Sequence, residues 1–232
     1  MKKITLIALC LFSTGIYAQT KTELQKHYEA FYDQMRLQGD VNGVIQALTH
    51  LNVLAPTTAR KDTLAYVYSS NNQHMQALNI LGIDKLEADS DLAVQVKAIS
   101  LKALEQPKRA LEHFEELAKR NPSAYLFYEV SDLKIVTGDN IGALASIKAG
   151  QALTKADMKY AFYERQQPYE VALKSAYFHL EALVTYNTDK AKIKEAIALI
   201  DRALVLSPNF NLASLSKQAL EGRLEKEVSK EE

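Results

Sequence analysis

The sequence is poor in the residues that build disulfide frameworks and turn-rich folds. It has one cysteine, no tryptophan, five prolines and eight glycines in 232 residues. A single cysteine excludes an intramolecular disulfide. Scarce glycine and proline disfavour β folds with many tight turns and suit helices. These absences indicate a helical protein.

No excess of charge of either sign is present. The 28 lysines and arginines balance 28 aspartates and glutamates. Without a basic excess there is little to neutralise phosphates, so no nucleic-acid partner is expected. Apolar residues make up 47% and charged residues 24%, as in folded soluble proteins rather than disordered chains.

The first eighteen residues have the pattern of an export signal. Lys2 and Lys3 precede an uncharged, largely apolar run over residues 4–16, and Ala18 offers a small residue before a cleavage point. This pattern predicts a secretory signal peptide over residues 1–18, with Gln19 as the new N-terminus. The mature protein is then exported, to the periplasm or the extracellular space. No later stretch is apolar enough to span a membrane.

Cys10 raises the alternative of a lipid anchor. A lipidated cysteine follows a small residue, whereas Leu9 stands here, so ordinary cleavage is the favoured interpretation. The mature chain then has no cysteine. A thiolate nucleophile and a cysteine metal site are therefore excluded.

The most informative feature is a repeat of 33 residues. Its anchor positions are equally spaced, and a fifth anchor, Ala196, follows later: Val44, Ala77, Ala110 and Ala143. Apolar residues recur four and seven positions after the anchors, and in three units a proline follows twelve positions after: Pro56, Pro122 and Pro208. Such self-similarity predicts a stack of repeated units.

Each unit consists of two amphipathic segments. Upstream of each anchor, apolar residues again follow i, i+3, i+4, i+7 spacing, as in Tyr28, Phe31, Tyr32 and Met35. Gly39 and Gly138 suit the turn between the two helices, because helices often end on a left-handed residue. The prolines close the second helix. Each unit is therefore a helical hairpin.

These units resemble the tetratricopeptide repeat (TPR) family over residues 25–214. The matching residues include Tyr28, Gly39, Leu48, Pro56, Ala65, Ala77, Ala98, Ala110, Phe114, Pro122, Gly138, Ala143, Ala196, Ala203 and Pro208. The second unit departs, with Lys61 and Asp84 in slots that are usually apolar. The resemblance implies an all-α, right-handed α-solenoid of about five helix pairs. We expect the solenoid over residues 19–214. A capping helix, with Leu212, Leu215, Ala219 and Leu220 toward the last unit, would end in a charged tail within 215–232.

An insertion at about 154–176 breaks the register. The anchor expected at position 176 occurs twenty residues later, and the added segment holds Tyr160, Phe162, Tyr163 and Tyr169. Pro168 fits the first turn of a helix, which predicts a long helix over about 168–186 after a short helix or ordered loop. The aromatic residues either grip a partner or serve packing, and packing is the favoured interpretation.

Partners of TPR proteins commonly bind the concave surface lined by the first helix of each unit. In this chain the candidate contact residues are Tyr66, Tyr125, Tyr128 and Asp132, with Tyr160 and Tyr163 from the insertion. Packing between units is the alternative role for Tyr125 and Tyr128. One subgroup of the family clamps a chaperone's C-terminal carboxylate. The acidic residues Glu29, Asp33 and Asp132 would repel that carboxylate, so membership of this subgroup is not expected.

No signature of catalysis, cofactor binding or metal binding is present. The sequence has no His-Glu-x-x-His, no Gly-x-Ser-x-Gly and no Gly-rich phosphate loop. His113 and Glu116 could share a helix face, where an exposed charge pair is the simplest interpretation. We therefore expect no catalytic residues, no cofactor and no metal ligands.

The sequence thus predicts a non-enzymatic scaffold or adaptor in the cell envelope that binds a protein or peptide through its concave face. Three alternatives remain. The aromatic insertion over residues 157–170 could bind a small molecule or glycan in a closed pocket. Separate units could bring a histidine and carboxylates together as an enzyme site. The chain could also associate with itself.

Overall fold

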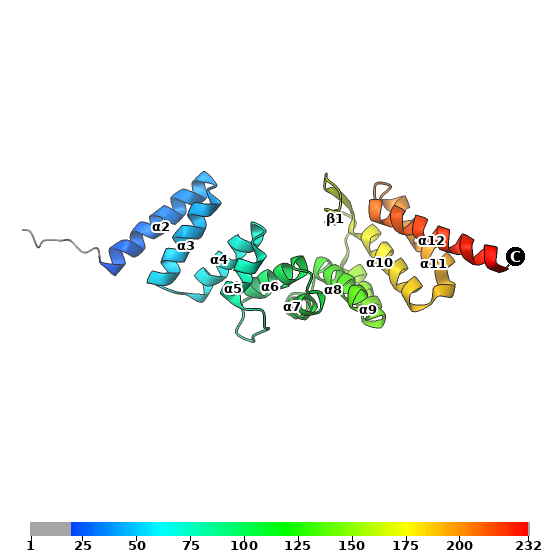
Figure 1. The fold of residues 1–232 in the computed structure, drawn as a ribbon, viewed down its shortest axis with the longest axis horizontal. Helices are drawn as coiled ribbons and strands as arrows, with labels where there is room; N and C mark the ends of the chain where they lie inside the picture. Colours follow the sequence, from blue (N-terminus) through cyan, green and yellow to red (C-terminus); the bar gives the residue numbers. More distant parts are fainter. Residues whose placement is uncertain (1–19, 232) are drawn as a thin grey trace, which may run out of the picture. The chain divides into compact units, whose positions relative to one another are not determined.

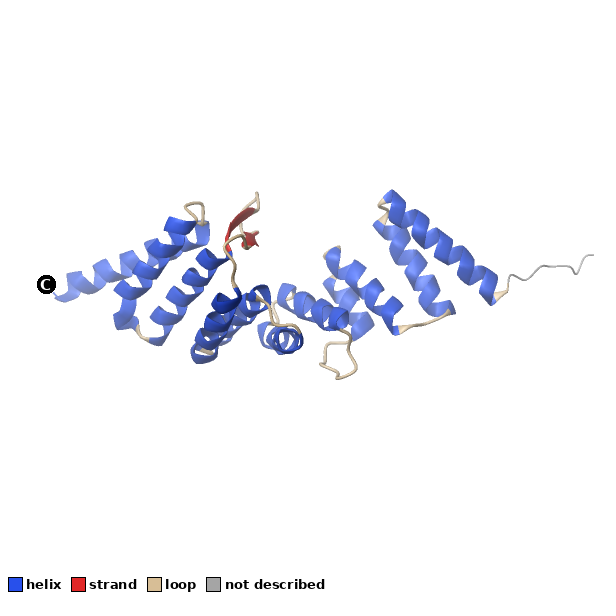
Figure 2. Ribbon diagram, turned by 180° about the vertical axis from the view of Figure 1, so that it is seen from behind, coloured by secondary structure: helices blue, strands red, loops and turns tan. Residues whose placement is uncertain are grey.

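The computed structural model describes the backbone of residues 20–231, so the predicted signal peptide lies outside the described residues. The chain divides into two compact units between Leu81 and Gly82. Each unit is built from pairs of consecutive helices that pack against each other. Figure 1 labels these helices, and Figure 2 separates them from the short strands by colour.

The first unit contains two helix pairs. They are α2 (Lys21–Gln38) with α3 (Val41–Leu54), and α4 (Thr58–Ser70) with α5 (His74–Leu81). Val44, Leu48 and Leu64 form its buried core. The departures in the second pair lie at its edges. Lys61 is exposed on α4, and Asp84 follows α5 in a loop.

The second unit contains three helix pairs, a hairpin of two strands and a last helix. Its elements are α6 (Asp91–Ala103), α7 (Pro107–Arg120), α8 (Ala124–Thr137), α9 (Asn140–Leu153), β1 (Lys159–Phe162), β2 (Tyr169–Ala172), α10 (Leu173–Thr188), the 3-10 helix η1 (Lys190–Lys192), α11 (Ile193–Leu206) and α12 (Asn211–Glu231). Five helix pairs and a C-terminal helix over residues 20–231 confirm the predicted all-α class.

The turns within two pairs follow from a Gly-Asp step. Gly39 and Gly138 end their helices in the left-handed region, at φ 70° and 88°. The aspartates that follow cap the next helix, because Asp40 Oδ1 and Asp139 Oδ1 accept the Gly43 and Gly142 amides at 3.0 and 2.8 Å. The predicted role of the two glycines is confirmed.

The predicted helix over 168–186 starts too early. Residues 169–172 form β2, which pairs antiparallel with β1 so that Tyr160 lies opposite Val171 and Phe162 opposite Tyr169. The helix begins at Leu173. The segment alternates because Phe162 and Val171 are buried whereas Lys159 and Glu170 are exposed, which is strand spacing rather than helix spacing.

The last helix packs on the second unit with a different side from the predicted one. Phe210, Ala213 and Leu220 are buried in the main core. Leu215 is 51% exposed and Ala219 is also exposed, so these two do not face the preceding pair. The helix continues through Glu231, so the predicted charged tail is largely helical.

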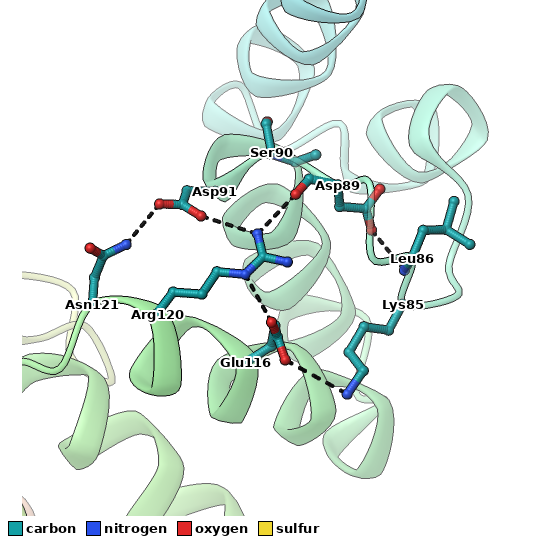
Figure 3. Close-up of polar contacts among 9 residues, drawn as sticks. Lys85, Leu86, Asp89, Ser90, Asp91, Glu116, Arg120 and Asn121 are labelled. Atoms are coloured by element: carbon teal, nitrogen blue, oxygen red, sulfur yellow. Dashed lines mark hydrogen bonds and ion pairs between the residues drawn. The ribbon is translucent and has the colours of Figure 1, made fainter.

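A network of polar contacts fixes the loop over residues 82–90 to α6 and α7. The Lys97 side chain is fully buried, and its Nζ donates to Asp89 Oδ2 at 2.7 Å and to the Asp84 carbonyl at 2.8 Å. Figure 3 shows the outer part, where Arg120 donates to the Asp89 carbonyl at 2.8 Å and pairs with Asp91 at 3.1 Å. The loop is thereby held as part of the second unit.

The buried His179 makes the stability of the second unit depend on pH. Its Nε2 lies 2.9 Å from Ser216 Oγ, and burial lowers the pKa of His179 to about 4. The unfolded chain takes up this proton near pH 6.5, so the contribution is present above that pH and is lost as the pH falls toward 4. We expect a loss of about 2 kcal/mol between pH 7 and pH 5.

Urea unfolding at several pH values checks this prediction. The variant His179→Gln should lack this part of the pH dependence, because glutamine does not titrate. An identical pH dependence in the native chain and the variant would contradict the assignment to His179.

Candidate interaction surface

The first helices of the third and fourth pairs, α6 and α8, each leave one side open to solvent. Their other sides are buried, for example through Val94 and Leu101 in α6 and through Val130 and Leu133 in α8. The open positions recur every three to four residues, which places them on one side of each helix. We call them the first-helix face, which consists of Gln95, Ile99, Lys102, Tyr125, Glu129 and Asp132.

A charged cluster crosses this face between the two helices. Lys102 Nζ lies 2.6 Å from Glu129 Oε2 and 3.2 Å from Asp132 Oδ2. Burial by itself would lower the pKa of Lys102, but the two carboxylates outweigh it and raise the pKa above its usual value. Lys102 therefore stays protonated at neutral pH. One positive side chain is thus held by two negative ones.

Two large apolar side chains lie on the same helices as the charges. Ile99 is 41% exposed on α6 and Tyr125 is 42% exposed on α8. Each is one helical turn from a charged residue of the cluster, Lys102 or Glu129. The face therefore combines apolar area with fixed charges, as protein interfaces do.

The hairpin adds to this face from one side. The Tyr160 hydroxyl in β1 donates to Glu129 Oε1, and its ring lies 4.2 Å from the ring of Tyr128. Burial, followed by the charge of Glu129, raises the pKa of Tyr160, so its hydroxyl remains a donor. Glu129 thus links α6, α8 and the hairpin, because its other carboxylate oxygen accepts from Lys102.

Removing the Tyr160 hydroxyl should loosen the hairpin. For Tyr160→Phe we expect a loss of about 1–2 kcal/mol in the free energy of unfolding, since a partly buried bond to a carboxylate disappears. Tyr163→Phe is the matched control, because Tyr163 is 74% exposed. Urea unfolding of both variants checks this, and equal effects would contradict the role of Tyr160.

The structure brings four of the six predicted contact residues together. Tyr125, Tyr128 and Asp132 lie on α8, and Tyr160 reaches the same helix from β1. Tyr128 is only 4% exposed and packs against the rings of Tyr160, Phe162 and Tyr177. Its environment is thus the packing alternative, because the hairpin covers it.

The other two predicted residues lie apart from this cluster. Tyr163 follows β1 and its side chain is 74% exposed in the loop between the strands. Tyr66 belongs to the first unit, where it is 47% exposed on α4. Exposure makes both available for contact, whereas Tyr128 offers little of its surface.

Sequence reasoning missed Glu129. Spacing of four and seven residues from Tyr125 leads to Glu129 and Asp132, so the exposed stripe was present in the sequence. The prediction chose Tyr128, which lies one residue away, because an aromatic residue is a favoured contact residue.

The space under the hairpin is filled by the aromatic residues themselves. The Phe162 ring lies 5.1 Å from Tyr160, 6.5 Å from Tyr128 and 4.9 Å from Phe210. A small-molecule site over residues 157–170 needs a closed pocket at this position. The packing of these rings supports a structural role for the inward side of the hairpin.

The buried histidines lie in separate places. His113 is 1% exposed, and its Nε2–H donates to the Ile83 carbonyl at 3.0 Å. Glu116 pairs with Arg120 instead, so the predicted exposed pair of His113 with Glu116 is wrong. Burial lowers the pKa of His113, which keeps it neutral at pH 7. No group of three or more metal-ligating side chains occurs within residues 20–231.

The same residues were searched for membrane spans. None of the helices in the described part of the chain is both long and apolar enough to cross a bilayer.

Comparison by sequence finds no relative of this chain. No protein-family model matches it, and no curated protein matches it. Comparison by structure gives several matches, all at low identity.

Three solved structures share the arrangement of helix pairs. YrrB, a TPR protein with an unusual peptide-binding site, matches with a TM-score of 0.65 at 15% identity, over 87% of this chain and 99% of that chain. MamA matches with a TM-score of 0.62 at 15% identity, over 81% and 93%. The segment of MamA from residue 41 to the end, from Desulfovibrio magneticus RS-1, gives 0.59 at 13% identity, over 81% and 97%. The chain is therefore a tetratricopeptide-repeat protein by its fold.

Proposed function

We propose that this protein is a non-enzymatic scaffold in the cell envelope that binds a protein or peptide segment through the first-helix face. The observation that carries the proposal is the exposed pair Ile99 and Tyr125 beside the cluster of Lys102, Glu129 and Asp132. Exposed apolar side chains next to fixed charges provide both contact area and specificity.

The charges of this face favour one kind of segment. Lys102 is already paired with two carboxylates, so the cluster carries an excess negative charge. A segment with a basic residue next to an apolar one would complement both the charge and Ile99 or Tyr125. The fold supports such use, because the structurally similar YrrB has a peptide-binding site.

Affinity capture from envelope extract, followed by mass spectrometry, tests the proposal. The variant carries Ile99→Asp and Tyr125→Ala, and circular dichroism should show that it stays helical, since both side chains are exposed. We expect a partner that the native chain captures and the variant loses at least tenfold. The control is Ile141→Asp on α9, where the side chain is 85% exposed and outside the face.

The outcomes separate the alternatives. Equal capture by the native chain and the variant would exclude the first-helix face. Capture of a second copy of this chain, supported by light scattering of the purified protein, would identify the partner as itself.

Export is tested independently of binding. Fractionation of the producing cell should place the protein outside the cytoplasm. N-terminal sequencing should then give Gln19 as the first residue. A cytoplasmic protein that retains residues 1–18 would contradict the envelope part of the proposal.

A further inference from the structure

A pocket of about 350 Å³ lies between α9, α10 and α11. It is lined by Gln151, Thr154, Lys174, Phe178, Glu181 and Arg202. None of these belongs to the first-helix face. The sequence had grouped Phe178 and Glu181 with the concave surface, whereas here they face α9 and α11. This pocket is therefore a separate feature of the second unit.

Arg202 is held in a fixed position at the rim of the pocket. Its guanidinium carbon lies 4.0 Å from the centre of the Phe178 ring, which is 7% exposed. A guanidinium over an aromatic ring keeps its N–H groups free to bind a carboxylate in two-point fashion. Within residues 20–231, neither Arg202 nor Lys174 has a hydrogen-bond or ion-pair partner.

The carboxylates near the pocket are already engaged. Glu181 Oε2 accepts from Gln151 Nε2 at 3.1 Å, and Asp201 pairs with Lys217 at 2.6 Å. The two cations are therefore the unpaired charges of the site. An anionic group placed between Lys174 and Arg202 would be paired by both.

An apolar surface adjoins these cations. A second hollow of about 360 Å³ shares Lys174, Phe178 and Arg202 and continues along α11. There Val205 is 80% exposed and Leu206 is 47% exposed. A free inorganic anion would leave both aliphatic side chains uncovered. A peptide that carries a carboxylate beside an aliphatic side chain covers them and pairs the cations in one binding event.

We propose that the pocket between α9, α10 and α11 is a second binding site, which takes an acidic-apolar peptide segment. The carboxylate of the peptide lies between Lys174 and Arg202, and its aliphatic side chain lies against Val205 and Leu206. The site is independent of the first-helix face, and its charge preference is the opposite. The same protein could thus hold two segments of different chemistry.

Selection of random twelve-residue peptides displayed on phage tests this site with the full chain. Peptides selected on the native protein should be enriched at least threefold in aspartate or glutamate next to an aliphatic residue. The enrichment should disappear on the variant Lys174→Gln with Arg202→Gln, and persist on the first-helix variant Ile99→Asp with Tyr125→Ala. Both substituted pairs are on the surface, and circular dichroism checks that the variants remain folded.

Synthesis of the most enriched peptide gives the second readout. Its dissociation constant should rise at least tenfold when Arg202 becomes Gln, and also when its acidic residue becomes the amide. Arg202→Lys should recover part of the affinity, because the charge remains but the two-point geometry is lost.

Three results would overturn the inference. The native chain might select no acidic-apolar class, or the class might survive the loss of both cations. The class might instead be lost on the first-helix variant, which would assign it to that face and leave the scaffold proposal standing.

Discussion

The substitution Asp89→Ala should lower the free energy of unfolding by about 3–5 kcal/mol, since it leaves a buried lysine without its partner. The Lys97 side chain has no exposed surface, and its charge is met by Asp89 at 2.7 Å. The same carboxylate accepts the Leu86 amide at 3.1 Å, so the variant also releases the loop over residues 82–90. Urea unfolding followed by circular dichroism measures the change.

Two further variants separate charge burial from a general loss of contacts. Asp91→Ala removes a nearby carboxylate that pairs with Arg120 but is 57% exposed, and its effect should be much smaller. The double variant Asp89→Ala with Lys97→Met should be more stable than Asp89→Ala alone, because no buried charge remains. Equal losses for Asp89→Ala and Asp91→Ala would contradict this account of the loop.

Gly150→Ala should cost about 3 kcal/mol, although alanine normally stabilises a helix relative to glycine. A Cβ at this position of α9 would lie 1.7 Å from the hydroxyl oxygen of Tyr177 and 2.9 Å from Cβ of Phe127. Tyr177 has no exposed surface, and its hydroxyl donates to the Ala124 carbonyl at 2.6 Å. The ring has no room to retreat without breaking that bond.

Gly222→Ala is the matched control on α12. No atom lies within 4 Å of the Cβ that it would add, so only helix propensity should act and the variant should gain about 0.5–1 kcal/mol. The two substitutions are chemically identical and should change stability in opposite directions. A gain in stability for Gly150→Ala would show that α8, α9 and α10 are not packed as described.

The helix pairs could be predicted because the repeat marks the closest contacts between helices. Ala77, Ala110, Ala143 and Ala196 all have no exposed surface, so only a small residue fits at these positions. The spacing of 33 residues therefore reports packing directly. Turns were predictable for the same reason, since Gly39 and Gly138 need a left-handed conformation.

The hairpin could not be predicted in the same way. Each strand has only four residues, which is too short for alternation to outweigh a helical pattern. Pro168 fits the start of a helix but fits the start of a strand equally well. The sequence located the insertion and left its secondary structure open.

The site was only partly predictable because it depends on where the hairpin packs. Exposure of Tyr125 follows from its position on α8, but burial of Tyr128 follows from contact with Tyr160 across 31 to 32 residues of sequence. The pairing of Lys102 with Glu129 likewise joins two different helices. Contacts of this kind arise from the tertiary fold and leave no local pattern.

Site-specific photo-cross-linking in the producing cell tests the central claim, that a partner occupies the first-helix face. A benzophenone amino acid would replace Tyr125 in one variant and Ile141 in another. Ile141 is 85% exposed against 42% for Tyr125, so random collision should label position 141 at least as well. The account predicts a discrete cross-linked product from position 125 that is absent from position 141. Equal products from both positions, or a product from position 141 alone, would contradict it.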